Sequence, residues 1–126
     1  MNLPPMPFQH IARARPESVP PVTIVTPSFN QVQYLEQALQ SVLSQNYPNI
    51  EYIVMDGGST DGSVEILQGY TDRIDYWTSE PDHGQADAIN RGLERAQGEI
   101  VAWLNSDDVY LPGAVQQAME AFSLNP

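Results

Sequence analysis

The chain has 126 residues, of which 16 are acidic, 5 are basic and none is cysteine, so its formal net charge is −11. This length allows one domain with a core of its own, and the missing cysteine excludes a disulfide scaffold and a thiolate zinc site. The acidic balance, with scattered arginines as the only basic residues, argues against nucleic acid as a partner.

Residues 1–21 differ in composition from the rest of the chain. They hold six of the 11 prolines, and proline removes backbone donors and disfavours helix in the residue before it. We therefore predict an extended arm or linker over 1–21 and a folded domain over 22–126. The alternative is that 1–21 is a short appendage packed on the domain. No apolar run approaches the roughly 20 residues of a membrane span and no signal peptide opens the chain, so we expect a cytoplasmic location.

From residue 22 onward, short apolar segments alternate with segments of helical periodicity. The β-branched and apolar segments predict four strands, at 22–26, 50–56, 74–79 and 100–104. Apolar residues at helical spacing predict four helices, at 32–44, 63–68, 84–96 and 112–124. Asn30 with Gln33, and Asp82 with Gln85, are candidate capping pairs, and Pro112 suits the first turn of the last helix.

Several side chains receive predictions from this pattern alone. The helix over 84–96 is expected to turn four apolar residues inward, namely Ala86, Ile89, Leu93 and Ala96. Trp77 and Trp103 lie in predicted strands and are expected in the core. His83 is expected in solvent, and Arg91 is expected to pair with Asp87 or Glu94.

Alternating strands and helices predict a parallel sheet with right-handed crossovers. Ligands of such sheets bind at the carboxyl ends of the strands. Polar residues follow each predicted strand at that end: Thr26-Pro27-Ser28, Asp56-Gly57-Gly58, Glu80-Pro81-Asp82 and Asn105-Ser106-Asp107-Asp108. The candidate site therefore consists of these four loops.

Asp107 and Asp108 are candidate metal ligands. Adjacent carboxylates at the end of a buried strand repel each other unless something compensates, and a divalent cation with oxygen ligands does so. Such a cation would also join an acidic protein to an anionic diphosphate. The alternative is that these aspartates only cap the following helix.

Asp56 ends the second predicted strand, where a carboxylate can accept hydrogen bonds from a ribose or a base. The alternative is a turn aspartate before two glycines. Residues 26–30 lead into a helix, where backbone amides can meet a nucleobase or phosphate. They lack the glycines of a dinucleotide fingerprint or a Walker loop.

Four motifs occur in order along the chain. They are Val-Thr-Ile-Val-Thr-Pro-Ser-Phe-Asn, Tyr-Ile-Val-Met-Asp-Gly-Gly-Ser-Thr-Asp-Gly-Ser, Ala-Ile-Asn-Arg-Gly-Leu-Glu-Arg-Ala-Gln-Gly-Glu-Ile and Leu-Asn-Ser-Asp-Asp. In this order and spacing, from about Val22 to the last helix, the chain resembles family 2 glycosyltransferases. The resemblance implies a Rossmann-like GT-A fold, a nucleotide-diphosphate sugar donor, a saccharide or other hydroxyl acceptor, and Mn²⁺ or Mg²⁺.

The resemblance also implies roles for residues on the nucleoside side of the site. Thr26, Pro27 and Ser28 match the loop that meets the nucleoside. Asp56 matches the carboxylate that holds the base, and Asp82 matches an aspartate near the nucleoside.

On the metal side, Asn105-Ser106-Asp107 matches the family's Asp-x-Asp motif. This match makes Asp107 the metal ligand, places Ser106 near the ribose and leaves Asp108 as a helper. Asn105 departs from the aspartate of the motif, which lowers the charge of the site and leaves Asp107 as the main ligand.

The implied reaction is an inverting transfer to an acceptor hydroxyl. A carboxylate base removes the proton of that hydroxyl while its oxygen attacks the anomeric carbon, and the metal stabilises the departing diphosphate. The resemblance places the acceptor half and this base beyond Pro126. We therefore expect residues 22–126 to be a donor-binding part, inactive alone and without a catalytic residue, and attachment of a longer protein to a membrane stays open.

Other classes fit the sequence less well. A receiver domain needs a lysine, which the chain lacks; a haloacid-type phosphohydrolase needs an aspartate where Thr26 stands; an NAD-binding domain needs the glycine fingerprint. A non-catalytic nucleotide-binding half-domain remains as the alternative, and comparing the activity of this chain with that of a longer one separates the two. We also expect the fourth strand to be an unpaired edge through which two chains form a homodimer.

Overall fold

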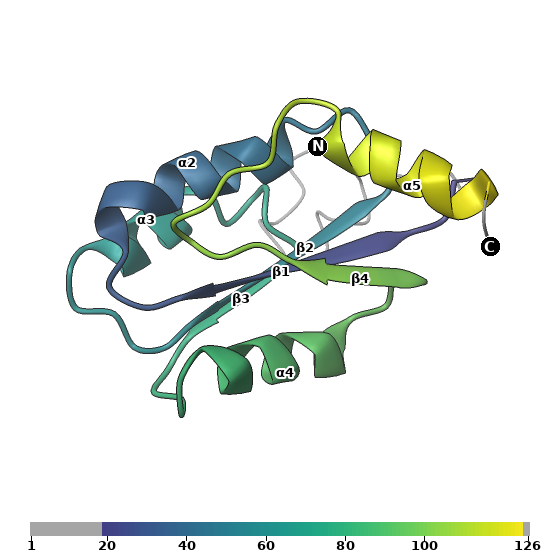
Figure 1. Ribbon diagram of the computed structural model, residues 1–126. Helices are drawn as coiled ribbons and strands as arrows, with labels where there is room; N and C mark the ends of the chain where they lie inside the picture. Colours follow the sequence, from purple (N-terminus) through teal and green to yellow (C-terminus); the bar gives the residue numbers. More distant parts are fainter. Residues whose placement is uncertain (1–18, 125–126) are drawn as a thin grey trace, which may run out of the picture.

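The computed structural model describes residues 19–124, which form a parallel four-stranded sheet with helices on both faces (Figure 1). The elements in chain order are β1 (Val22–Ser28), α2 (Val32–Leu43), β2 (Ile50–Asp56), α3 (Ser63–Gly69), β3 (Tyr76–Ser79), α4 (Gln85–Arg95), β4 (Ile100–Trp103) and α5 (Ala114–Leu124). Helices α2, α3 and α5 cover one face of the sheet, and α4 covers the other (Figure 1). The α/β fold with about four parallel strands is confirmed, as are all eight predicted elements.

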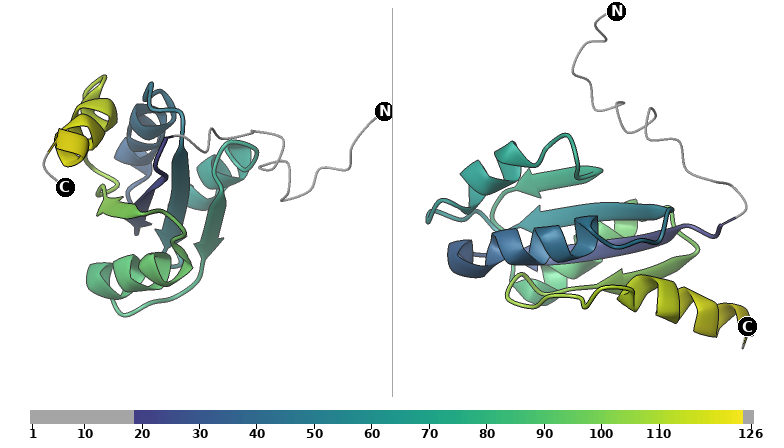
Figure 2. Two further views of the ribbon diagram at one scale, coloured as in Figure 1. Left: turned by 90° about the vertical axis from the view of Figure 1, so that its right-hand side faces the viewer. Right: turned by 90° about the horizontal axis from the view of Figure 1, so that it is seen from above.

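The strand order is β3-β2-β1-β4, and all neighbouring strands are parallel. β1 pairs with β2 over its whole length and with β4 over its first four residues. The chain moves outward from β1 through β2 to β3 and then crosses to the far side of β1 for β4 (Figure 2). The boundary between β1 and β4, where the strand order reverses, is therefore the sheet's topological switch point, and ligands of such folds bind at the carboxyl ends of the strands there.

The core has two parts, one on each face of the sheet. The larger cluster lies under α2, α3 and α5 and includes the fully buried Leu35, Leu39 and Tyr52. The smaller cluster lies under α4 and contains Val25, Ile53, Met55 and Ala88. All seven residues of β1 are buried, as a central strand covered on both faces requires.

The buried stripe of α4 differs from the predicted one. The structure buries Ala88 and Gly92, which are one helical turn apart, whereas Ala86 is exposed and Ile89 and Leu93 are only half-buried. A Cβ on Gly92 would lie 2.5 Å from Cγ1 of Val25. The prediction is wrong for Ala86 and holds for Leu93, which packs against the smaller core. It missed Ala88 and Gly92 because it followed hydrophobicity, whereas the helix approaches the sheet through its smallest residues.

The two tryptophans have different environments. Trp77 is half-buried against the larger core, and its Nε1–H donates to Oγ1 of Thr71 at 3.0 Å. Trp103 is 57% exposed, so the prediction that it lies in the core is wrong. The reason is positional: Trp103 lies on the edge strand β4, while α4 packs on β1 and β2.

The predicted Asn30–Gln33 pair does not cap α2. Instead, the backbone N–H of Val32 donates to Oδ2 of Asp61 at 3.0 Å. Asn30 has a φ of 51°, a left-handed conformation that asparagine tolerates better than most residues. The cap of α2 therefore comes from the loop after β2, which local sequence patterns do not reveal.

Two elements begin two residues later than predicted. β3 starts at Tyr76 rather than at residue 74, and Ile74 is apolar because it is buried in the core ahead of the strand. α5 starts at Ala114 because Gly113 has a left-handed φ of 82°, so Pro112 stands outside the helix.

Most of the predicted arm over 1–21 lies outside the described residues. The last part of it is attached to the domain, since Oη of Tyr47 donates to the carbonyl of Pro20 and Nδ2 of Asn49 donates to the carbonyl of Val19. Over residues 19–124, no helix has both the length and the apolar character that crossing a membrane requires. β4 forms one edge of the described sheet, and self-association through it stays a prediction.

Candidate functional site

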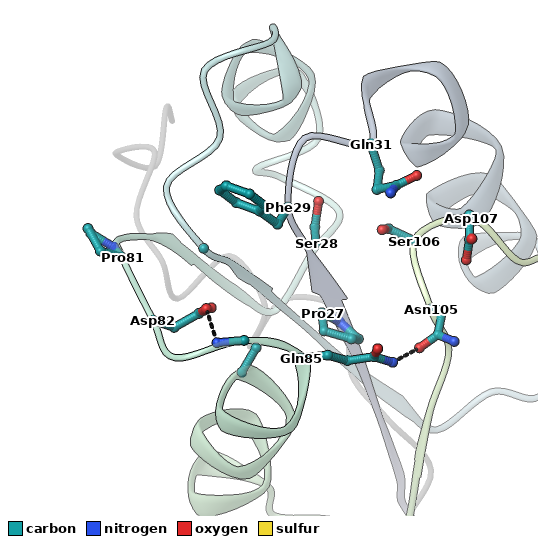
Figure 3. A pocket seen from close by; sticks show the side chains of 13 residues that line it. Pro27, Ser28, Phe29, Gln31, Pro81, Asp82, Gln85, Asn105, Ser106 and Asp107 are labelled. Atoms are coloured by element: carbon teal, nitrogen blue, oxygen red, sulfur yellow. Dashed lines mark hydrogen bonds between the residues drawn. The ribbon is translucent and has the colours of Figure 1, made fainter.

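A cavity of about 570 Å³ lies at the carboxyl end of the sheet and is lined by residues of the loops after β1 and β4, among others (Figure 3). Residues from all four predicted loops contribute to its walls. Of the predicted site residues, those that line it are Pro27, Ser28, Asp82, Ser106 and Asp107. Thr26, Asp56 and Asp108 are absent from the lining. The structure therefore brings together five of the eight predicted residues.

Ser28 ends β1 and is only 4% exposed. Its Oγ is the one buried side-chain polar atom among residues 19–124 without a hydrogen-bond partner in the protein. An unpaired buried hydroxyl costs about 1–3 kcal/mol, so such a group calls for an explanation. Because Ser28 lines the cavity, a polar group of a bound ligand is a natural partner (Figure 3).

Asp82 lies on the opposite wall, just ahead of α4. Its Oδ1 accepts a hydrogen bond from the N–H of Gly84, the N-cap residue of α4, at 2.9 Å. The predicted pairing of Asp82 with Gln85 does not form, because the side chain of Gln85 reaches across the cavity to Asn105 (Figure 3). A Cβ on Gly57 would lie 2.9 Å from Oδ2 of Asp82, so the glycine leaves room for this carboxylate.

Asp56 is 2% exposed and organises the loop after β2. Its Oδ2 accepts hydrogen bonds from the N–H groups of Gly58 and Ser59 and from Oγ of Ser79, and its Oδ1 accepts one from Oγ of Ser59. A carboxylate offers about four acceptor positions, and here protein groups use four. The turn role of Asp56 is thus visible in this structure, and its role toward a base stays a prediction.

Thr26 is fully buried beneath the cavity, on the side of the larger core. Its Oγ1 lies 2.7 Å from Oη of Tyr52. Burial raises the pKa of the Tyr52 phenol and outweighs the opposite effect of the bond to Thr26, so the phenol stays protonated. Thr26 thus links β1 to β2 through its hydrogen bond with Tyr52, and its contact with a nucleoside stays a prediction.

The loops after β1 and β2 hold each other in place. Oγ of Ser59 accepts the N–H of Asn30 at 2.8 Å, and Oδ1 of Asn30 accepts the N–H of Thr60 at 2.9 Å. Desolvation raises the pKa of Asp61, but hydrogen bonds from Ser63 and Val32 outweigh it and hold that pKa below its ordinary value. These hydrogen bonds fix one wall of the cavity, the wall that contains Ser28 and Phe29.

The loop that is predicted to hold the metal follows β4. Asp107 is exposed and lines the cavity, whereas Asp108 is exposed outside the lining. No three acidic or histidine side chains of residues 19–124 come close enough together to hold a metal ion. Mg²⁺ in phosphate-handling sites is usually held by one or two carboxylates together with oxygens of the substrate phosphates. The donor set therefore fits a cation bound jointly with a diphosphate, and not a cation held by protein alone.

Comparison with known proteins decides the family. Residues 23–126 match the model of glycosyl transferase family 2. The chain belongs to this family. An uncharacterized glycosyltransferase of Mycobacterium tuberculosis (strain ATCC 25618 / H37Rv) is 44% identical over 108 residues, which are 84% of this chain and 41% of the relative. The putative teichuronic acid biosynthesis glycosyltransferase TuaG of Bacillus subtilis (strain 168) is 42% identical over 104 residues, covering 80% of this chain and 41% of TuaG.

Solved structures agree with this assignment. Mannosyltransferase PcManGT from Pyrobaculum calidifontis, in complex with GDP-Man and Mn²⁺, is 28% identical with a TM-score of 0.73, covering 89% of this chain and 34% of that one. S. aureus TarS 1–349 in complex with UDP-GlcNAc is 24% identical with a TM-score of 0.75, covering 82% and 31%, and supports the GT-A fold alone. This chain spans about two fifths of the length of the curated relatives named above.

Sequence reasoning missed several residues of this family 2 site. Phe29 is 58% exposed and lines the cavity. The available signal was its place in residues 26–30, which sequence analysis considered only for their backbone amides. Gln31 and Gln85 also line the cavity. The sequence around them suggested helix capping and gave no indication of ligand contact. Arg91 lies outside the lining and pairs with Asp87 and Glu80, each at 3.2 Å.

The prediction of an ion-paired Arg91 is confirmed for Asp87, whereas Glu94 is not its partner. The side chain of His83 is 89% exposed, as predicted, and its Nδ1 lies 3.3 Å from Oδ2 of Asp87. Neither basic side chain therefore faces the cavity, and the charged groups that line it are carboxylates.

Proposed function

We propose that this chain forms the donor-binding part of an inverting glycosyltransferase. The donor is a nucleotide-diphosphate sugar, the acceptor is a saccharide or another hydroxyl compound, and a divalent cation, Mn²⁺ or Mg²⁺, joins the diphosphate to the protein. Family membership supports the reaction class, and the PcManGT complex with GDP-Man and Mn²⁺ supports the kind of donor and metal.

One observation carries the proposal. The unpartnered Ser28 hydroxyl lines a cavity of about 570 Å³ at the switch point of a parallel sheet. Cavities of about 300–1,000 Å³ hold small molecules, and this place in the sheet is where nucleotides bind in doubly wound folds. A donor that bonds Ser28 would satisfy the one unpaired buried side-chain polar atom of the described residues.

Each wall of the cavity has a proposed task. Ser28 and Asp82 receive polar groups of the nucleoside, and the exposed ring of Phe29 offers a surface on which a planar base can stack. Asp107 would hold the cation, with Asp108 and Ser106 beside it in the same loop. A bound cation acts as a Lewis acid that neutralises charge on the departing diphosphate.

We assign no residue of this chain the role of general base. Transfer to an acceptor requires such a base, so the reaction itself is proposed for a protein that includes an acceptor-binding part. We propose a cytoplasmic location, where nucleotide sugars are made.

Titration calorimetry tests the donor site. GDP and UDP are each titrated into the wild-type chain with Mn²⁺ and, separately, with a chelator. We expect binding of one nucleotide that requires Mn²⁺, is lost in Asp107→Ala and is weakened in Ser28→Ala. The matched control is Asp72→Ala, which removes one exposed carboxylate from the turn before β3, away from the cavity.

The outcomes are distinct. Metal-dependent binding that Asp72→Ala preserves and Asp107→Ala removes would support the proposal. Equal loss in both aspartate variants would indicate a general charge effect, and no binding of either nucleotide by the wild type would overturn a donor site in this chain.

A further inference from the structure

A hydrogen bond between two amide side chains spans the cavity. Nε2 of Gln85, the first residue of α4, donates to Oδ1 of Asn105 at 2.5 Å (Figure 3). Asn105 follows β4, and both residues line the cavity. The bond thus connects the helix behind Asp82 with the loop that carries Asp107.

Asn105 is also the first residue of the turn that presents Asp107. Its backbone carbonyl accepts the N–H of Asp108 at 3.0 Å, so Ser106 and Asp107 are the central residues of a four-residue turn. Asparagine is favoured at the first position of such turns. A side-chain bond that orients Asn105 therefore bears on the backbone of the turn that carries Asp107.

Few other bonds hold this turn. Just before it, the N–H of Leu104 donates to the carbonyl of Val25, and just after it, the N–H of Tyr110 donates to Oγ of Ser41. Among residues 19–124, Gln85 provides the one side chain that is hydrogen-bonded to residues 105–108. Within the turn only Ser106 is buried, whereas Asp107 and Asp108 are exposed, so packing holds the turn at Ser106 and not at the two aspartates.

We propose that Gln85 and Asn105 form a positioning pair that sets the Asp107 turn for metal-dependent donor binding, an inference that rests on the proposed function. In this proposal Asn105 acts through Asp107, as a neutral amide whose oxygen accepts the hydrogen bond from Gln85. An aspartate at this position would accept the same bond but add a third carboxylate beside Asp107 and Asp108.

Two readouts on the whole chain test the pair. The first is amide hydrogen exchange over residues 105–110 without ligand, and the second is the Kd for GDP and UDP with Mn²⁺. We expect Gln85→Ala and Asn105→Ala each to speed exchange in the turn several-fold and to weaken nucleotide binding about tenfold, which is typical for losing an outer hydrogen bond of a metal site. The double variant should match either single variant, because both remove the same bond.

Two further variants separate positioning from other effects. Asn105→Asp keeps an acceptor for Nε2 of Gln85, so exchange in the turn should stay slow. Gln31→Ala removes a cavity-lining glutamine that is not bonded to the turn, so it should also leave that exchange unchanged.

Unchanged exchange in Gln85→Ala and Asn105→Ala would overturn the inference whatever the nucleotide data show. Additive losses of affinity in the double variant would also overturn it, because they would indicate two independent ligand contacts. A wild type that binds neither nucleotide would overturn the proposed function and the binding part of this inference together, while the exchange data would still decide whether the pair orders the turn.

Discussion

Replacing Gly92 with alanine tests how closely α4 approaches the sheet. The added Cβ would lie 2.5 Å from Cγ1 and 3.0 Å from Cγ2 of Val25, and 3.3 Å from Cγ of Met55. Val25 is fully buried in the central strand, so its side chain cannot rotate away without meeting other core atoms. The substitution therefore forces α4 outward or strains β1.

The expected size of the effect follows from two opposing contributions. Overpacking a closely packed core costs about 1–3 kcal/mol, and the short distance to Val25 favours the upper end. Alanine in place of glycine within a helix gains about 1 kcal/mol. We therefore expect Gly92→Ala to lower the free energy of unfolding by about 2 kcal/mol.

Urea unfolding of Gly92→Ala and Gly69→Ala measures this difference. Gly69 ends α3, and a Cβ there would meet nothing within 4 Å, so Gly69→Ala should be neutral or slightly stabilising. Combining Gly92→Ala with Val25→Ala should relieve part of the cost, because the second change removes the atoms in conflict. If Gly92→Ala were as stable as Gly69→Ala, the close approach of α4 to β1 would be refuted.

Three further predictions concern the site and its supports. Gly57→Ala should displace the carboxylate of Asp82, because the new Cβ would lie 2.9 Å from its Oδ2. We expect calorimetry to show nucleotide binding weakened about tenfold, with a urea midpoint near that of the wild type; unchanged affinity would contradict a role of Asp82 in binding. The pKa of Asp61 in the folded protein lies below its ordinary value of 3.8, so the stability that its ionised form contributes is complete above that value and is lost as pH falls through the folded-state pKa. The free energy of unfolding should therefore fall less between about pH 7 and about pH 3 in Asp61→Asn than in the wild type; equal falls would rule out this role. Tyr52→Phe should cost about 1–3 kcal/mol because it leaves the buried Thr26 hydroxyl without its partner; Thr26→Val in the same chain should recover part of that cost, and simple additivity would argue against the bond.

The strands and most helix bounds were predictable because their signals are local. β2 has its predicted bounds, and β1 extends its predicted range by two residues. Both are apolar runs ended by polar loops. Local patterns failed where an element's environment came from elsewhere in the chain: Asp61 caps α2 from a loop 29 residues away, and α4 approaches the sheet through Gly92.

The candidate site was predictable in part for a related reason. Parallel strands place their carboxyl ends together, so Ser28, Asp82 and Asp107 could be grouped before any distance was known. Which side chains face the cavity and which turn inward depends on the course of each loop. Asp56 turns into its own loop and Thr26 turns into the core, although both lie beside residues that line the cavity.

By itself, the sequence determined the alternation of strands and helices, the parallel sheet and the family. The first two follow from the spacing of apolar residues, and the family follows from the order of the motifs. Only the tertiary structure decided the unpaired hydroxyl of Ser28, the room that Gly57 leaves for Asp82 and the bond between Gln85 and Asn105. Each of these depends on atoms from segments far apart in the chain. Their distances are set by how helices and loops pack on the sheet, and no local pattern of residues encodes that packing.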